Sequence, residues 1–176
     1  MSRLSKLQTF TFFVAIMSLG LLASCYRNVD RGEWSIGSHL SINVSNVEQL
    51  SVVPYTEDGK EYVIRPRNPA NLLTVAKVLL VNRKSSRIAL LIDTRAAAML
   101  NRNLVRYPAV DPFGDQRKQS DTTASSEPDL YLPFLWGEIS LGQDTELQGW
   151  MVFETPPQFE PFQFRWDQAE TLFVRP

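Results

Sequence analysis

The sequence contains one cysteine and one histidine, and this shortage excludes several kinds of functional site. A lone cysteine cannot close a disulfide within the chain, and zinc or iron–sulfur sites need several cysteine or histidine ligands. His39 lies beside no acidic residue, and the chain has no G-x-S-x-G, H-E-x-x-H or C-x-x-C-H motif. A Ser-His-Asp triad is therefore not expected, and we interpret His39 as an ordinary residue at a strand edge. We expect no metal, no cofactor and no catalytic residue.

Blocks of basic residues are also missing. Lysine and arginine together number 18, against 19 aspartate and glutamate residues, for a net charge of −1. Proteins that bind nucleic acids present clustered positive charge, so nucleic acid is not an expected partner. Acidic residues gather in the segment 111–129, but their spacing does not match the ligand pattern of an EF-hand. We interpret this polar segment as a long mobile loop, with a weak calcium site as the alternative.

An apolar run without a single charge, Thr9–Leu22, follows the basic residues Arg3 and Lys6 at the start of the chain. The apolar region of a secretory signal peptide has about 7–15 residues, whereas a membrane-spanning helix needs about 20. The run ends in Leu22-Ala23-Ser24-Cys25, which resembles the lipobox of bacterial lipoproteins. The resemblance implies cleavage before Cys25 and a diacylglycerol attached to its thiol. It makes Cys25 the expected lipidation site.

This N-terminal pattern predicts the organisation of the chain. Residues 1–24 are expected to be a lipoprotein signal peptide, 25–38 a lipid-anchored tether, and 39–176 the folded domain. A retained helix over residues 1–24 is the alternative, and it would leave the domain on the same, non-cytoplasmic side of a bacterial membrane. An Asp directly after the cysteine would resemble an inner-membrane retention signal, but this chain has Tyr26 there. Sorting to the outer membrane is therefore allowed, and the choice between inner and outer membrane stays open.

The pattern of apolar residues after His39 is that of short strands. Leu40, Ile42 and Val44 alternate with polar residues, which is typical of a half-buried strand. Further extended segments are expected at 52–55, 62–64, 72–81, 88–93, 104–107, 147–154, 162–166 and 171–175, with a helix as the alternative for 72–81. We expect a turn over 57–60, a hairpin turn over 82–86, and a short helical insert over 95–100 because alanine is the best helix former. Many short strands and little helix predict an all-β antiparallel sandwich.

Three short motifs resemble the immunoglobulin-like extracellular domain of uncharacterised bacterial lipoproteins. They are the paired run 73–81, Asn82 and 88–93; Val105–Pro108 followed by Asp111-Pro112; and Gly142 with the segment 149–156. The resemblance implies an immunoglobulin-like β-sandwich over residues 39–176. It also implies a binding or accessory module with no shared catalytic machinery.

Aromatic residues are the candidates for contact with a partner or ligand. Most of those in the last third of the chain are expected to pack between two sheets. Phe159 and Trp166 are expected to be exposed, because they flank a Pro-rich segment and a turn. Trp34 is either an anchor at the lipid headgroups or, as we favour, a cap on the core.

Three functions are open at this point. The favoured one is a non-catalytic, membrane-anchored lipoprotein of the cell envelope that binds another envelope protein as an accessory subunit. The alternative is a lipoprotein that binds a glycan or a small apolar ligand. The third is an enzyme that uses carboxylates alone, with Asp167 and Glu170 as the pair, although we interpret these two residues as turn formers.

Overall fold

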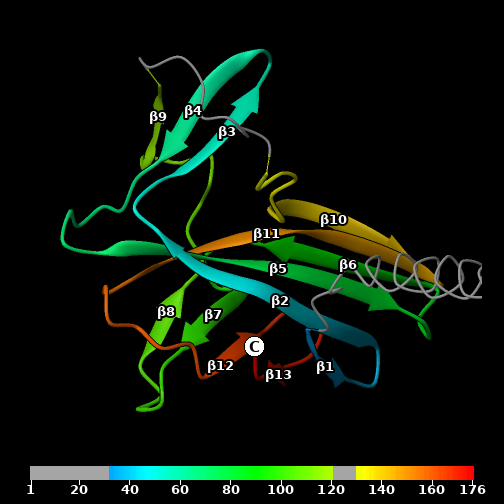
Figure 1. Ribbon diagram of the computed structural model, residues 1–176. Helices are drawn as coiled ribbons and strands as arrows, with labels where there is room; N and C mark the ends of the chain where they lie inside the picture. Colours follow the sequence, from blue (N-terminus) through cyan, green and yellow to red (C-terminus); the bar gives the residue numbers. More distant parts are fainter. Residues whose placement is uncertain (1–31, 121–129) are drawn as a thin grey trace, which may run out of the picture. The chain divides into compact units, whose positions relative to one another are not determined.

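The computed structural model describes residues 32–120 and 130–176 (Figure 1), and residues 32–176 belong to one compact unit. The predicted signal peptide, Cys25 and the first half of the predicted tether lie outside the described residues, as does the segment 121–129. The described part is built from β-strands and contains no helix, so it holds no helix that could cross a membrane. Its named strands pair antiparallel throughout. The predicted all-β antiparallel class is confirmed.

The largest element is a four-stranded main sheet in the order β1-β2-β5-β11. Its strands are β1 (Glu33–Ile36), β2 (Leu40–Leu50), β5 (Leu72–Asn82) and β11 (Thr145–Thr155). Facing it lie a pair, β10-β6, and a second four-stranded sheet, β13-β12-β7-β8. These strands are β6 (Arg87–Ile92), β7 (Ala97–Leu100), β8 (Arg106–Pro108), β10 (Gly137–Gly142), β12 (Gln163–Trp166) and β13 (Leu172–Val174).

A small sheet completes the fold. It has the order β3-β4-β9, with β3 (Val53–Glu57), β4 (Lys60–Ile64) and β9 (Arg117–Gln119). Asp58 and Gly59 form the β3–β4 turn with φ values of 51° and 72°. Two positive φ angles in a two-residue loop match the right-handed twist of a hairpin, and the predicted turn over 57–60 is confirmed. In Figure 1 the small sheet projects away from the sandwich strands.

The main core lies between the main sheet and the strands that face it. The alternation predicted for β2 is confirmed, since Leu40, Ile42 and Val44 are all buried there. The core takes alternate residues from nearly every strand of both layers, including Ala76, Val78, Leu80, Leu90, Ile92, Met99, Met151, Phe153, Phe164, Trp166, Leu172 and Val174. Burial of these side chains is the main source of stability of the sandwich.

A second core lies on the opposite face of the main sheet. Leu73 and Val75 of β5 and Trp150 and Val152 of β11 point to it, one residue out of phase with the main core. The small sheet supplies Val53, Tyr55 and Ile64. The first half of β5 is therefore buried on both faces, which explains why its sequence reads as a continuous apolar run.

Two local predictions are wrong. Residues 97–100 form strand β7 and not a helical insert, because β7 is hydrogen-bonded between β12 and β8 and all four residues are buried. Tertiary pairing overrides the helix propensity of alanine here. The segment 82–86 is not a hairpin turn, because both edges of β5 are already taken by β2 and β11, and β6 pairs with β10.

The segment predicted as a loop over 111–129 is partly a strand. Within it β9 adds to the edge of β4, with Lys118 opposite Val63 and Arg117 opposite Ile64. The guanidinium of Arg117 lies 3.7 Å from the ring centroid of Tyr62 and pairs with Glu57. A cation–π contact and an ion pair thus hold a three-residue strand that has little apolar content of its own.

Candidate binding site

Two of the aromatic residues predicted to contact a partner are buried. Trp166 is fully buried, and Phe159 is 6% exposed. Trp166 points into the main core opposite Ala97, whose small side chain leaves room for the indole, and its Nε1 donates to the carbonyl of Gln168 at 2.8 Å. The expectation that Phe159 and Trp166 are exposed is wrong, because the turn and proline residues beside them do not turn their rings outward.

Trp34 was favoured as a cap on the core, but it is exposed. It lies on the edge strand β1, and half of its side-chain surface is exposed, so it does not cap the core. His39 is exposed just before β2, with its Nδ1 3.2 Å from the Ser85 hydroxyl. This position agrees with an ordinary residue at a strand edge.

The two carboxylates considered as a catalytic pair have structural partners. Glu170 accepts hydrogen bonds from the backbone N–H groups of Ser38, His39 and Leu40 at 2.7–2.8 Å. Burial raises the pKa of Glu170, but these three donors outweigh it and hold the pKa below its usual value. Asp167 accepts from Arg165 at 2.8 Å and pairs with Arg106 at 2.9 Å. Within the described residues no group of acidic, histidine or cysteine side chains could hold a metal ion.

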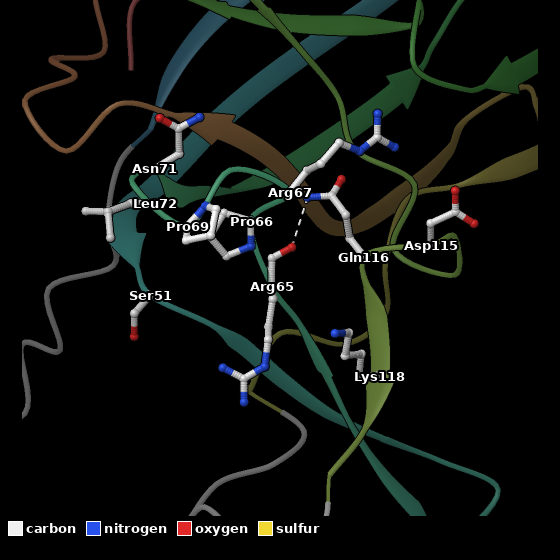
Figure 2. Close-up of a pocket in the computed structure, with 10 residues that line it drawn as sticks. All are labelled: Ser51, Arg65, Pro66, Arg67, Pro69, Asn71, Leu72, Asp115, Gln116 and Lys118. Carbon is white, nitrogen blue, oxygen red and sulfur yellow. Dashed lines mark hydrogen bonds between the residues drawn. The ribbon is translucent and has the colours of Figure 1, made fainter.

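The feature best suited to binding is a hollow of about 540 Å³ beside the small sheet. It is bordered by the connection from β4 to β5 and by the start of β9. Figure 2 shows its lining residues, which are Ser51, Arg65, Pro66, Arg67, Pro69, Asn71, Leu72, Asp115, Gln116 and Lys118. We call this feature the hollow.

The positive charge of the hollow follows from strand register. Lys118 is opposite Val63, and the Arg65 N–H donates to the carbonyl of Gln116 at 3.0 Å, which extends the ladder by one residue. This register places Arg65 and Lys118 on one face of the small sheet as diagonal neighbours. Neither forms an ion pair with any residue in the described part of the chain. Two like charges held side by side favour an anion between them.

Arg67 lies on a different side of the same connection. In Figure 2 its side chain extends away from that of Arg65. It also borders a second cavity of about 350 Å³, which it shares with Asp111, Asp115 and Glu154. Asp111 and Glu154 line only the second cavity, whereas Asp115 lines both, so the hollow holds three cations and one carboxylate.

One half-buried carboxylate fixes the wall of the hollow. Glu154 on β11 accepts from the backbone N–H groups of Arg67 and Asn68 and from the side-chain amides of Asn71 and Gln116, at 2.8–2.9 Å. Burial raises the pKa of Glu154, but its four donors together hold the pKa below its usual value. The wall is therefore preorganised by hydrogen bonds that need a charged carboxylate.

The chemistry of the lining favours binding over catalysis. Among the described lining residues the only hydroxyl belongs to Ser51, and there is no histidine or cysteine to activate it. Arg65 and Lys118 supply charge, Asn71 and Gln116 supply amides, and prolines supply apolar surface. This set can hold an anionic group.

Sequence reasoning missed the hollow. Arg65 lies in the Pro-rich connection after the segment 62–64, and Lys118 lies in a segment predicted to be a loop. The register between β4 and β9 brings them together, and no local pattern reports it. The signal available in the sequence was Arg65-Pro66-Arg67. The residue before a proline favours an extended backbone, so this sequence places two cations on an extended segment.

No protein-family model and no curated protein matches the chain. Two solved structures resemble it in part. One is MPT63, a secreted protein of Mycobacterium tuberculosis, with 12% identity, a TM-score of 0.44, and coverage of 78% of this chain and 82% of that one. The other is the YjhA protein of Bacillus subtilis, with 10% identity, a TM-score of 0.47, and coverage of 78% and 79%. The all-β architecture described above follows from the strand pairing of this chain itself.

Proposed function

We propose that this chain is a lipid-anchored, non-catalytic accessory module of the bacterial cell envelope that holds an acidic segment of a partner protein in the hollow. The observation that carries the proposal is the pair of cations, Arg65 and Lys118, which share one face and have no ionic partner in the described residues. The motif ending at Cys25 supports attachment to the membrane through lipid.

The composition of the lining distinguishes between the candidate ligands. Small apolar ligands favour cavities lined mainly by apolar and aromatic side chains, whereas the lining of the hollow carries the charged residues Arg65, Arg67, Asp115 and Lys118 (Figure 2). Sugars commonly stack on aromatic rings, and none of the ten residues drawn in Figure 2 is aromatic. Pro66, Pro69 and Leu72 instead offer apolar contact to an extended chain whose carboxylates face Arg65 and Lys118.

The overall charge of the protein supports selective attraction at this point. The chain carries a net charge of −1, so its surface does not attract acidic segments in general. Two neighbouring cations on a mildly acidic protein attract an acidic partner to the place where they lie. Binding driven by such charges weakens as salt concentration rises.

A charge reversal tests the proposal. We expect R65E/K118E in the full chain, purified in mild detergent, to bind a fluorescent oligoglutamate peptide at least tenfold more weakly in an anisotropy titration. The matched control is R83E/K84E, which makes the same change of charge on two exposed residues between β5 and β6. An equal loss of affinity for the peptide in both variants, or no loss of affinity in R65E/K118E, would refute the binding role of the hollow.

The partner and the anchor are tested in the membrane. Cross-linking in intact envelopes should recover one protein in stoichiometric amount with the wild type and with R83E/K84E, but not with R65E/K118E. The cross-linked peptide should contain several acidic residues. The intact mass of the extracted protein should show cleavage before Cys25 and acylation, and a full-length unmodified mass would contradict the anchor.

A further inference from the structure

Exposed apolar side chains gather along one edge of the sandwich. Trp34 and Ile36 on β1 are 50% and 78% exposed, and Phe173 on β13 is 46% exposed. The strands β1 and β13 contact each other (Figure 1), so they form one edge of the sandwich, with Trp34 and Ile36 on the outer face of the main sheet and Phe173 on the outer face of the second sheet. We call it the β1–β13 edge.

The register shows that all three side chains point outward. Trp34 is opposite Asn43 and Ile36 is opposite Ser41, on the face of β2 that points away from the main core. On β13 the neighbours of Phe173, Leu172 and Val174, are buried in that core. The outward direction follows from the strand period, so rotation of the side chains cannot bury them.

An uncovered edge of this kind is a liability. Edge strands with exposed apolar side chains pair with other chains unless something protects or covers them. Among the described residues nothing covers Trp34, Ile36 or Phe173 further. These three side chains therefore need a surface outside the described chain to cover them.

The position of β1 in the chain points to the bilayer. Trp34 is nine residues after Cys25, and an extended chain spans at most about 3.3–3.6 Å per residue, so the indole lies within roughly 30 Å of the proposed lipid. Tryptophan is enriched at the level of the lipid headgroups. β1 is also the first strand after the proposed anchor.

Arginine side chains lie beside the apolar ones. Arg165 is opposite Phe173 on the same face, with its guanidinium 5.6 Å from the ring centroid. Arg175 follows on that face two residues later, with its guanidinium over Phe162. Aromatic rings with adjacent cations match the boundary between acyl chains and phosphates.

From these observations we infer that the β1–β13 edge lies in the headgroup layer of the bilayer that holds the lipid on Cys25, with Trp34, Ile36 and Phe173 in contact with lipid. This inference rests on the proposed lipid anchor. It adds a defined orientation of the domain, because a lipid on a tether would otherwise leave the domain free to rotate.

Quenching of tryptophan fluorescence by brominated lipids tests the orientation. The full chain is reconstituted in phosphatidylcholine–phosphatidylglycerol vesicles with or without bromine on the acyl chains. The emission of Trp34 is obtained as the difference between wild type and W34F, because Trp136, Trp150 and Trp166 are present in both proteins. We expect brominated lipid to remove most of the Trp34 emission, and I36S/F173S to restore much of it. The matched control is L104S, which alters a residue 61% exposed in the turn before β8 and should leave quenching unchanged.

The outcomes separate the orientation from the anchor. Intact mass is measured on the same sample. An acylated protein whose Trp34 emission is the same in both kinds of vesicle would refute the orientation and leave the anchor standing. An unacylated mass would refute the anchor, and with it the inferred orientation. Quenching of Trp34 in acylated protein that is unaffected by I36S/F173S would also count against the β1–β13 edge as the contact surface.

Discussion

Replacing Glu154 with glutamine should destabilise the wall of the hollow. The substitution conserves size but replaces one carboxylate oxygen with an NH₂ group, which cannot accept the two hydrogen bonds that this oxygen receives. On one side these are from Asn68 and Asn71, and on the other from Arg67 and Gln116. Whichever way the amide turns, two donors lose their acceptor.

The expected magnitude follows from the hydrogen bonds lost. Each hydrogen bond to a charged group contributes about 1.5–3 kcal/mol, and the glutamine retains neutral bonds on its oxygen. We therefore expect E154Q to lower the free energy of unfolding by about 2–4 kcal/mol. For a domain of this size that lowers the unfolding midpoint by roughly 4–16 °C.

The pH dependence provides an independent check. Because the pKa of Glu154 is lower in the folded state than its usual value of 4.5, its contribution is complete above that value and is lost as pH falls through the folded-state pKa. The difference between wild type and E154Q should therefore be constant near neutrality and shrink in acid.

Thermal unfolding followed by circular dichroism, in mild detergent over a range of pH, measures both effects. The matched control is E146Q on the same strand, since Glu146 is exposed and has no hydrogen bond or ion pair in the described part of the chain. A midpoint for E154Q equal to that of E146Q, or a difference that persists undiminished in strong acid, would refute the role assigned to Glu154.

Three further changes test the packing. W166A should lower the free energy of unfolding, measured by chemical denaturation, by about 3–5 kcal/mol, because it empties a fully buried site in the main core. A decrease of less than about 1 kcal/mol would contradict that burial. Burial raises the pKa of Tyr55 to about 12 from 10.0, so its neutral form stabilises the fold below pH 10.0 and this contribution is lost as pH rises through about 12. Y55F should remove that alkaline loss, as measured by unfolding against pH, and an unchanged profile would exclude Tyr55 as its source. G37A should shift the unfolding midpoint downward at least as far as E170Q, because a Cβ at Gly37 would collide with the Glu170 carboxylate; a midpoint equal to wild type would show that this contact yields easily.

Patterns confined to one strand were predictable from the sequence. Alternation in β2 and the apolar run of β5 each reflect burial of that strand, and the Asp58-Gly59 turn depends on the backbone of two residues. Such features are set within a few residues, so a single sequence carries them.

Features that depend on distant pairing were not predictable. The alanines of β7 form a strand because β12 and β8 lie on both sides of it, although alanine by itself favours helix. Likewise, Arg65 and Lys118 become neighbours only through the pairing of β4 with β9. The direction of Trp166 is decided by its register against Ala97, and the turn beside it carries no sign of that choice.

The uninterrupted strand β5 sets the distance between the hollow and the β1–β13 edge. Leu72 at its start borders the hollow, and Asn82 at its end is opposite Leu40, next to the strands of the β1–β13 edge. Eleven residues of strand span about 35 Å, and the first half of this span is stiffened by packing on both sides. If the β1–β13 edge rests on the lipid surface, β5 is a rigid spacer. The length of this one strand then limits the distance from the lipid surface at which the hollow holds the acidic segment of the partner.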